Sequence, residues 1–397
     1  MMKAEVVTAL SDQLRDGIDV HRCAAARALA RVAAPDSVDA LCGALLDEDP
    51  DVRTDAAAAL GQFADPLTAE KLLQNLIGDP CCEVKISAIE TLVTMRHAPV
   101  IAWLRRLVAS RDENIAWDDD EFFSGAWDDW LDVQLAAIRG LGQFGAVEGV
   151  PEICAAFHDE MGQDVSEYAI DALRLLGEPG ATALTKVFQE GDERLRRRIA
   201  SAVGETSQPE LQVLQELCLN DDSAAVRQAA VLGLADTNPD DERLVDRFSD
   251  NDPEIREKVV ELCGQAFPEQ VLLRIEDKVP AVKCAAFRTV TAQPELFAEE
   301  GFGDLIQSNV AGHPLVSGEA AKAWTALTGA RALPALRASF VDTDQPVPFR
   351  RLLIQALERL GSEAVEVLAT AAGDDDRQIR IARLVNLDIT NHGRIVL

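Results

Sequence analysis

A short pattern that recurs from one end of the chain to the other is the feature that most constrains its fold. Residues 49–61 read DPDVRTDAAAALG, residues 222–234 read DSAAVRQAAVLGL and residues 252–264 read DPEIREKVVELCG. Each copy has an acidic turn, a β-branched or leucine anchor, a basic residue and an alanine-rich apolar stretch. Self-similarity at a fixed period is typical of repeat proteins, in which each unit buries its apolar face against its neighbours.

The spacing of the pattern identifies the repeating unit. Neighbouring anchors lie 27 to 34 residues apart, except for one step of 49 residues between Val84 and Val133. Apolar or small residues follow each anchor at +4, +7 and +8, as Ala56 and Leu60 follow Val52, and this spacing marks one face of an α-helix. We place the anchors at Val20, Val52, Val84, Val133, Val165, Leu195, Val226, Ile255, Val282, Val316, Phe349 and Ile379.

A unit of about thirty residues with one amphipathic helix after each turn has room for a second helix and two short connections. Glycines such as Gly61, Gly204 and Gly264 follow the apolar stretch, where they can end the helix. No segment shows the two-residue alternation of a strand. The sequence therefore predicts an all-α fold, an α-solenoid or α-α superhelix of about twelve helix pairs, in a single array over residues 1–397.

These units resemble the HEAT-like repeats of the phycobilisome-lyase type, in which an Asp in the turn and an Arg at the start of the second helix recur. The resemblance covers nearly the whole chain and implies the HEAT fold. It leaves the function open, because the family includes lyase subunits, assembly factors and uncharacterised scaffolds. The basic residue stands at Arg53, Lys85, Arg196, Arg227, Arg256, Lys283, Arg350 and Arg380, and it is replaced by His21, Gln134, Ser166 and Ser317.

We interpret the recurring Asp and Arg residues as structural, because paired charges can satisfy the polar backbone of buried turns. The last unit breaks the apolar spacing by placing Arg383 at +4. A charged residue on that face is typical of a polar cap at the end of an array.

The charge balance limits the class of partner. The formal net charge is −30, from 68 acidic against 38 basic side chains. Nucleic acids and anionic membranes are recognised by basic surfaces, so we expect neither as a partner. A protein partner with a basic or apolar surface is favoured, and solubility alone is the other explanation of the acidity. The acidic N-terminus and the lack of a long apolar run predict a soluble, cytoplasmic protein.

The long step between anchors indicates an insertion at residues 112–131, in the fourth repeat. The segment NIAWDDDEFFSGAWDDWLD, residues 114–132, holds three of the five tryptophans and no Lys or Arg. Long loops on rigid scaffolds often carry function, and aromatic residues dominate protein interfaces. We predict that this loop binds a partner through Trp117, Asp118, Asp119, Asp120, Glu121, Phe122, Phe123, Trp127, Asp128, Asp129 and Trp130.

Two other interpretations of the insertion stay open. The aromatic rings could fold back onto the solenoid and leave only the carboxylates in water. A calcium loop that begins at Asp118 would place Phe122 at its fifth position, where an EF-hand needs oxygen, and it would lack the glycine at the sixth. The sequence therefore disfavours a dedicated metal site.

A run of arginines, Arg194 and Arg196–Arg198, opens the second helix of the sixth unit. Helical spacing spreads these side chains over several faces. We therefore favour a solvated turn that is balanced by Asp192 and Glu193. An anion site, or a contact with the chain's own acidic loop, is the alternative.

The patterns typical of enzymes are missing from the sequence. None of the five histidines precedes a Glu, whereas the di-iron hydroxylases among HEAT-repeat proteins use His-Glu pairs. No nucleophile motif, phosphate-binding loop or CxxC pair occurs, so we predict no catalytic residue, cofactor or metal. The predicted function is a non-catalytic protein-binding scaffold, or an assembly or chaperone-type adaptor, that uses the solenoid groove and the acidic aromatic loop. The alternative is a bilin lyase-like subunit that binds a tetrapyrrole chromophore.

Overall fold

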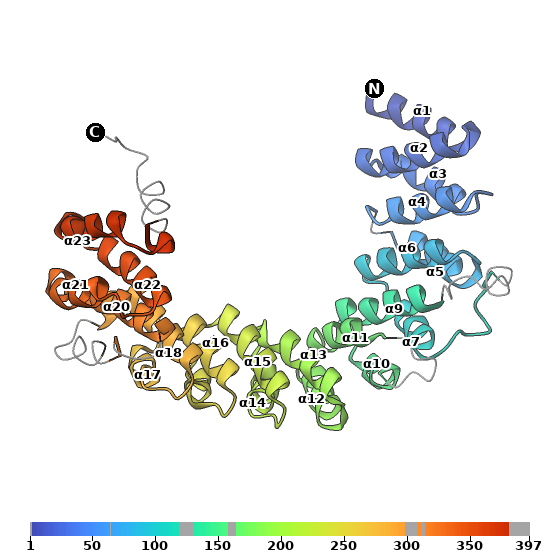
Figure 1. The fold of residues 1–397 in the computed structure, drawn as a ribbon. Helices are drawn as coiled ribbons and strands as arrows, with labels where there is room; N and C mark the ends of the chain where they lie inside the picture. The colour runs from blue at the N-terminus through green and yellow to red at the C-terminus, as the bar shows by residue number, and fades with distance from the viewer. Residues whose placement is uncertain are drawn as a thin grey trace. The chain divides into compact units, whose positions relative to one another are not determined.

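The computed structural model describes residues 2–63, 65–118, 130–157, 164–297, 306, 309–310 and 314–380. Within these ranges every regular element is a helix, so the predicted all-α fold is confirmed (Figure 1). The helices fall into two compact units, residues 1–203 with 208–214 and residues 204–207 with 215–397. Among the helices that the structure describes, none combines the length and the apolar character that a membrane span requires.

The first unit consists of helix pairs in two rows. Helices α2, α4, α6, α9 and α11 pack side by side in this order, while α3 packs on α1 and α10 packs on α7 and α12. The elements are α1 (Met2–Asp16), α2 (Asp19–Val32), η1 (Pro35–Ser37), α3 (Val38–Ala44), α4 (Pro50–Leu60), α5 (Pro66–Gly78), α6 (Cys82–Thr94), α7 (Val100–Ala109), α9 (Trp130–Phe144), η2 (Val147–Gly149), α10 (Val150–Ala156), α11 (Ser166–Arg174), α12 (Gly177–Glu190), α13 (Glu193–Gly204) and η3 (Pro209–Leu211).

The second unit repeats this plan. Helices α15, α16, α18, α20 and α22 pack in succession, and shorter elements such as η4, α17 and α21 lie against them. The elements are α14 (Gln212–Leu219), α15 (Ala224–Thr237), η4 (Glu242–Ser249), α16 (Pro253–Cys263), α17 (Pro268–Arg274), α18 (Pro280–Ala292), η5 (Pro294–Phe297), α20 (Pro314–Thr328), η6 (Gly329–Ala332), α21 (Leu333–Val341), α22 (Val347–Glu358), η7 (Gly361–Ala364), α23 (Val365–Thr370) and η8 (Ala371–Gly373).

The turn sequence determines where the second helix of a unit begins. Asp49 and Asp252 precede the prolines that open α4 and α16, and their carboxylates accept hydrogen bonds from backbone N–H groups of the first turn. A proline at this position loses no hydrogen bond, because the first N–H groups of a helix have no partner within it. The DP pairs that mark the repeat are therefore helix starts.

The core follows the predicted spacing and extends it. In α4 the anchor Val52 is buried together with Ala56, Ala57 and Leu60, and α6 buries the corresponding residues from Val84 onward. Position +5 is thus buried as well as +4, +7 and +8. The wider apolar face is needed because each second helix packs against both of its neighbours in the row.

The register of the first repeat differs from the prediction by one residue. Val20, the predicted anchor, is 65% exposed. Arg22 donates to Asp47 at 2.8 Å, which is the contact that the basic residue after the anchor makes in later units. The anchor position therefore belongs to His21, and the basic residue predicted to be missing from this unit is present as Arg22. The predicted register is one residue too early because it uses the apolar Val20 as the anchor.

Candidate partner-binding surface

A ladder of charged hydrogen bonds joins the turns of successive units. The guanidinium of Arg227 donates to the carbonyl of Asp221 in its own turn, at 2.8 Å. It also donates through two nitrogens to the carboxylate of Asp250 in the following turn, at 2.9 and 2.8 Å. That carboxylate accepts the backbone N–H of Asp252 as well. Equivalent contacts connect Arg53 with Asp79, Arg256 with Asp277 and Arg350 with Asp374.

The environment of Asp250 shows why the ladder is stable. Burial on its own would raise the pKa of the Asp250 carboxyl, but hydrogen bonds from Arg227 and from the Asp252 N–H outweigh it and lower the pKa. The Asp250 carboxylate is thus favoured in its charged form, which accepts hydrogen bonds from Arg227 and from the Asp252 N–H. The contacts agree with the structural interpretation of the repeated Asp and Arg residues.

The ladder changes at the insertion, where Lys85 occupies the position of the arginine. Its side chain is fully buried, and its Nζ donates to the carbonyls of Leu76, at 3.1 Å, and Asp79. No described carboxylate forms an ion pair with it. The ammonium instead lies 5.2 Å from the ring centroid of Trp117 in the insertion. Burial lowers the pKa of Lys85 to about 8, although the charge of Asp79 opposes this shift.

Residues 112–117 dock onto the helices that precede the insertion. The backbone N–H of Ala116 donates to the carbonyl of Ile77 at 2.8 Å, and Ile115 is buried. The indole Nε1 of Trp117 donates to the carbonyl of Asp112 at 3.0 Å. This first part of the insertion is therefore bound to the end of α5 and is not a free loop.

Asp112 fixes the turn that begins the insertion. Its carboxylate accepts the backbone N–H and the side-chain amide of Asn114, at 2.8 and 2.9 Å, and the Nε of Arg106 at 2.5 Å. These bonds, with those to Asn114 first, lower the pKa of Asp112. The guanidinium of Arg111 also lies over the Trp117 ring, 5.2 Å from its centroid.

The far end of the insertion is secured to α7. Trp130 donates from Nε1 to the carbonyl of Leu107 at 3.0 Å, and Gln134 donates from Nε2 to the carbonyl of Val108 at 2.9 Å. The last carbonyls of a helix have no partner within it. In this repeat an indole and an amide satisfy two of them. We call residues 112–117 and Trp130 the stem of the insertion.

The predicted binding residues divide into two groups. Trp117 and Trp130 are half-buried and belong to the stem, and Asp118 is exposed where the stem ends. These two rings thus pack back on the scaffold, as one of the open interpretations proposed. The other predicted residues lie outside the described residues: Asp119, Asp120, Glu121, Phe122, Phe123, Trp127, Asp128 and Asp129.

Lys85 and Gln134 were not linked to the insertion from the sequence, and Asp112, its first residue, was given no role. A signal was available, because Lys85 and Gln134 replace the ladder arginine in the two repeats on either side of the insertion. Gln134 was already noted as a replacement for the basic residue. A change of the basic residue in two successive repeats indicates that other side chains make its contacts there.

Comparison with known families agrees with this repeat geometry. A family model for HEAT repeats matches residues 7–76 and 150–235, and a model for the PBS lyase HEAT-like repeat matches residues 133–159. The chain carries HEAT repeats. The second match covers the helix pair that directly follows the insertion. No curated protein matches the chain.

The solved structures to which the chain is similar share little of its sequence. The crystal structure of Kap121p has a TM-score of 0.56 and 11% identity, and the match covers 97% of this chain and 49% of that one. Kap121p bound to Ste12p gives 0.57 and 12%, with coverages of 96% and 48%. The chain thus spans about half the length of these proteins, and the likeness concerns the fold alone. The CpcE–CpcF complex of phycocyanin lyase from Nostoc sp. PCC7120 gives 0.34 and 20%, with coverages of 66% and 94%.

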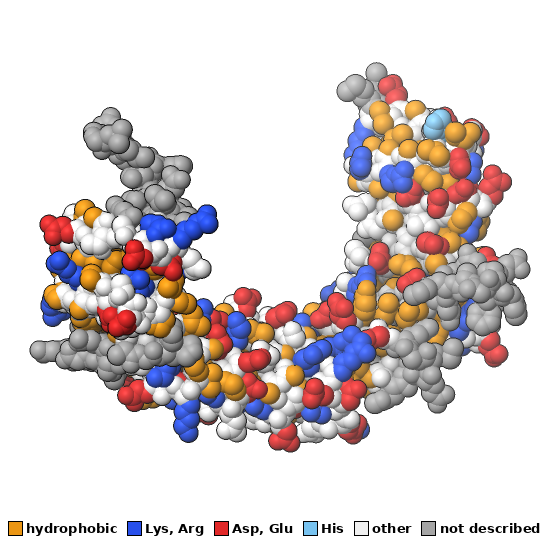
Figure 2. Space-filling view, in the orientation of Figure 1, with side chains coloured by type: hydrophobic (Ala, Val, Ile, Leu, Met, Phe, Trp, Pro, Cys, Tyr) orange, Lys and Arg blue, Asp and Glu red, His pale blue; other side chains and the backbone are white. Residues whose placement is uncertain are grey.

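The arginine run belongs to the second helix of another HEAT repeat, α13, where Figure 2 shows Lys and Arg side chains gathered on the first unit. Arg194 and Arg198 donate to the carboxylate of Asp164, at 3.1 and 2.6 Å. The hydrogen bond from Arg198 is the main reason that the pKa of Asp164 falls to about 2. The partner that the structure describes is thus Asp164 in the preceding turn, and not the predicted Asp192, whose carboxylate accepts the N–H of Leu195 at 2.8 Å.

The thiols in the HEAT repeats are unsuited to nucleophilic chemistry. Burial raises the pKa of Cys263 to about 12 and of Cys23 to about 11, so these groups stay protonated near neutral pH. A reactive cysteine needs a lowered pKa. Among the described residues, no group of three His, Cys, Asp or Glu side chains is placed to hold a metal ion.

Proposed function

We propose that this HEAT-repeat chain is a non-catalytic cytoplasmic scaffold, or an assembly or chaperone-type adaptor, that binds a protein partner. The insertion is its main contact, together with the groove predicted for the solenoid. The observation that carries the proposal is the stem. Hydrogen bonds from Trp117 and Trp130 secure both ends of an acidic aromatic segment, which otherwise interrupts the repeat.

The composition of residues 118–129 indicates the chemistry of the partner. The segment combines Phe122, Phe123 and Trp127 with six acidic residues and contains no Lys or Arg. Aromatic side chains provide most of the binding energy in many interfaces, and surrounding charges accelerate encounter and set specificity. A complementary partner therefore offers an apolar pocket bordered by Lys or Arg.

The stem makes a clean test possible, because it can be kept while the segment between its ends is replaced. In the test variant, a Gly/Ser linker of equal length replaces residues 119–129, and Trp117, Asp118 and Trp130 remain. Tagged wild-type and variant proteins are expressed at equal levels in the cells of origin, and quantitative mass spectrometry compares the proteins that co-purify. We expect at least one partner to be lost from the variant, while helicity by circular dichroism is unchanged.

A charge-matched control separates recognition from general acidity. One variant changes the six acidic residues among residues 118–129 to amides, and the control changes six exposed acidic residues of the second unit. Loss of the partner only from the insertion variant supports the proposal. Recovery of the same partners by every variant would show that the insertion is not the binding site. The control residues are Asp240, Glu242, Glu254, Glu269, Glu363 and Glu366.

A bilin lyase-like subunit is the second candidate, and the match of residues 133–159 to the PBS lyase HEAT-like repeat favours it. A tetrapyrrole held by the protein would change its visible absorption. The purified protein is mixed with a free bilin and passed over a gel-filtration column. A bilin band that elutes with the wild-type protein would favour the lyase-like function over the scaffold.

A further inference from the structure

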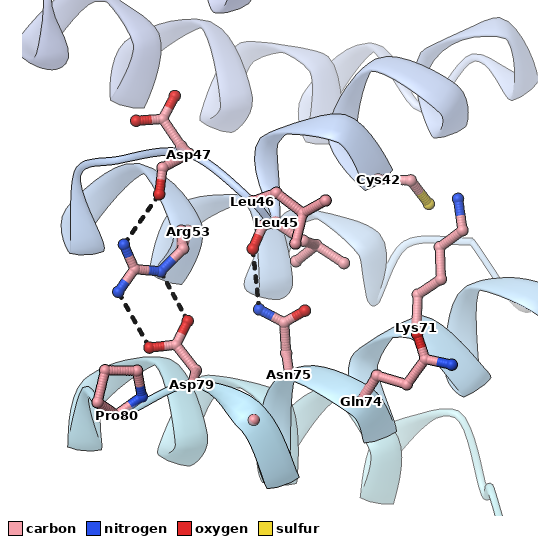
Figure 3. Close-up of a pocket in the computed structure, with 11 residues that line it drawn as sticks. Cys42, Leu45, Leu46, Asp47, Arg53, Lys71, Gln74, Asn75, Asp79 and Pro80 are labelled. Carbon is pink, nitrogen blue, oxygen red and sulfur yellow. Dashed lines mark hydrogen bonds and ion pairs between the residues drawn. The ribbon is translucent and has the colours of Figure 1, made fainter. Parts of the chain in front are cut away.

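The first unit holds a cavity between α3 and α5, and none of its lining residues belongs to the insertion (Figure 3). Its volume is about 580 Å³. The cavity arises because α3 is short and because Gly78, at the end of α5, has no side chain to fill the space. Cavities of this size accommodate ligands of several hundred daltons or a few residues of a peptide.

A buried amide with an unused acceptor faces this cavity. Asn75 is only 8% exposed, and its Nδ2 donates to the carbonyl of Leu45 at 3.0 Å. A carbonyl can only accept, so this bond fixes which end of the amide is the nitrogen. The Oδ1 of Asn75 consequently points into the cavity, as Figure 3 shows, and it accepts no hydrogen bond from a described residue. This oxygen is therefore open to an N–H donor of a ligand in the cavity.

The same helix presents an uncompensated cation. Lys71 lies four residues before Asn75 on α5, is exposed, and forms no ion pair with a described residue. The other charged groups at the cavity are neutralised, since Arg53 is paired with Asp79 at 2.6 Å and Asp47 with Arg22 at 2.8 Å. The cavity therefore favours an anionic group, although the chain as a whole is strongly acidic.

Apolar residues also line the cavity. Leu46 is 86% exposed, and Leu45 and Cys42 are buried. An exposed leucine next to a cation and a free acceptor provides three different kinds of contact in one place. The combination fits a group that carries an apolar side chain, a carboxylate and an N–H donor, as a peptide does.

We infer that this cavity is a second binding site, separate from the insertion, for a short extended peptide segment with an Asp or Glu next to an apolar residue. Side chains four apart on a helix are about 6 Å from each other, and residues i and i+2 of an extended chain are about 6.6 Å apart. The carboxylate can therefore contact Lys71 while an N–H two residues away donates to Asn75. The apolar side chain then packs on Leu46.

The experiment starts from a random heptapeptide phage library selected against the full-length protein. The most enriched sequences are synthesised with a fluorescent label, and binding is measured by fluorescence anisotropy. We expect an Asp or Glu beside an apolar residue in the enriched sequences. We expect Lys71→Glu to weaken binding at least about tenfold, because it replaces attraction by repulsion.

A second variant blocks the cavity without changing charge. Gly78 lines the cavity and a Cβ there would meet no atom within 4 Å, so Gly78→Trp is chosen to introduce a large side chain at the cavity wall. Two matched controls carry the same changes elsewhere, namely Lys186→Glu on α12 and Gly373→Trp in the second unit, where the space is also open. We expect both controls to bind like the wild type.

The outcomes decide the inference one way or the other. Failure to enrich any sequence with an Asp or Glu beside an apolar residue, or unchanged affinity of such a peptide in Lys71→Glu and Gly78→Trp, would overturn it. The variant with a Gly/Ser linker at residues 119–129 distinguishes this site from the proposed function. It is expected to keep the peptide affinity even if it loses the partner that the insertion binds.

Discussion

Lys85 illustrates how one rung of a repeat ladder adapts to an insertion. An arginine can donate hydrogen bonds to turn carbonyls and to a carboxylate at the same time, because its N–H groups form a planar fork. The compact ammonium of Lys85 satisfies only the carbonyls of Leu76 and Asp79 and lies near the face of Trp117. An aromatic face attracts a cation but does not neutralise it. Among the described residues, the buried Lys85 ammonium therefore has no carboxylate in an ion pair with it.

This burial makes the stability of the first unit depend on pH. Because the pKa of Lys85 is lowered from 10.5 to about 8, the unfolded chain binds the proton more tightly between these values. The unfolding free energy of the wild type should thus rise, relative to Lys85→Met, by on the order of 3 kcal/mol from pH 7.5 to pH 10.5. Urea titrations followed by tryptophan fluorescence measure this difference, since four of the five tryptophans lie between residues 103 and 130.

An exposed lysine on the neighbouring helix provides the control. Lys71→Met removes the same charge from α5 without removing a buried group. Its unfolding free energy should follow the wild type at every pH. A constant difference between the wild type and Lys85→Met across this range would mean that the pKa of Lys85 is the same in the folded and the unfolded protein.

In the second unit, Asp250 is a buried carboxylate, and its contribution to stability can be measured in the same way. Its side chain is 2% exposed and is paired with Arg227 and Arg247. Removing one partner of a buried pair leaves the other charge uncompensated, so Asp250→Ala should lower the unfolding free energy by about 3 kcal/mol. Asp55→Ala, which breaks the more exposed pair with Arg27, should cost less than about 1 kcal/mol. Chemical denaturation followed by circular dichroism compares the two.

The direction of the Asp250 shift determines how acid acts. Its pKa is lowered in the folded protein, so its contribution is complete above the ordinary pKa of about 4 and is lost as the pH falls through the folded value. The gap between wild type and Asp250→Ala should therefore close in acid. A gap as large at pH 2 as at pH 7 would contradict the assignment.

At the scale of the elements, the repeat could be predicted because three independent signals coincide at each unit. The DP turns give the helix starts, the apolar spacing gives the buried face, and the basic residue after the anchor gives the ladder. The register failed only at Val20, where an apolar side chain stands one residue before the position that Arg22 defines. In this repeat the basic residue Arg22 indicates the register correctly, whereas the apolar residue Val20 does not.

The insertion was less predictable, because its stem is held by contacts between residues distant in sequence. Composition alone placed Trp117 and Trp130 among binding residues. In the structure the indole of Trp117 donates to the carbonyl of Asp112 within the stem, and that of Trp130 donates to the carbonyl of Leu107 on α7. Composition also gave no sign of the cavity at Asn75. That cavity depends on how α3 and α5 lie relative to each other, which no local pattern encodes.

The stem predicts that α7 depends on the insertion's far end. Trp130→Phe and Gln134→Leu each remove a donor from the last carbonyls of α7 and leave that carbonyl unpaired, at a cost of about 1–3 kcal/mol. Hydrogen exchange in α7 and α9 should therefore become faster in both variants. Trp103→Phe on α7 itself is the matched control, because its ring is stacked with Arg106 and its indole caps no carbonyl in the structure. Equal exchange rates in all three variants would show that the capping bonds are unimportant.

At the scale of the whole molecule, the HEAT repeats and the fold shared with Kap121p establish the architecture but leave the function to be tested. We propose, as the spacing predicts, that the units form a single array in which stability is a sum over neighbours. Such an array has no central core. A destabilising substitution in one repeat should then affect only the repeats that pack against it.

Ile255→Asp tests this directly, because Ile255 is buried in α16 between α15 and α18. A carboxylate at this position cannot be hydrated without opening the helix, so local stability should fall by several kcal/mol. In hydrogen exchange with mass spectrometry, we expect rapid exchange in α15, α16 and α18 and unchanged protection in α4 and α6. If α4 and α6 lose protection together with α16, the chain unfolds as one cooperative body, and the sum over neighbours does not describe it.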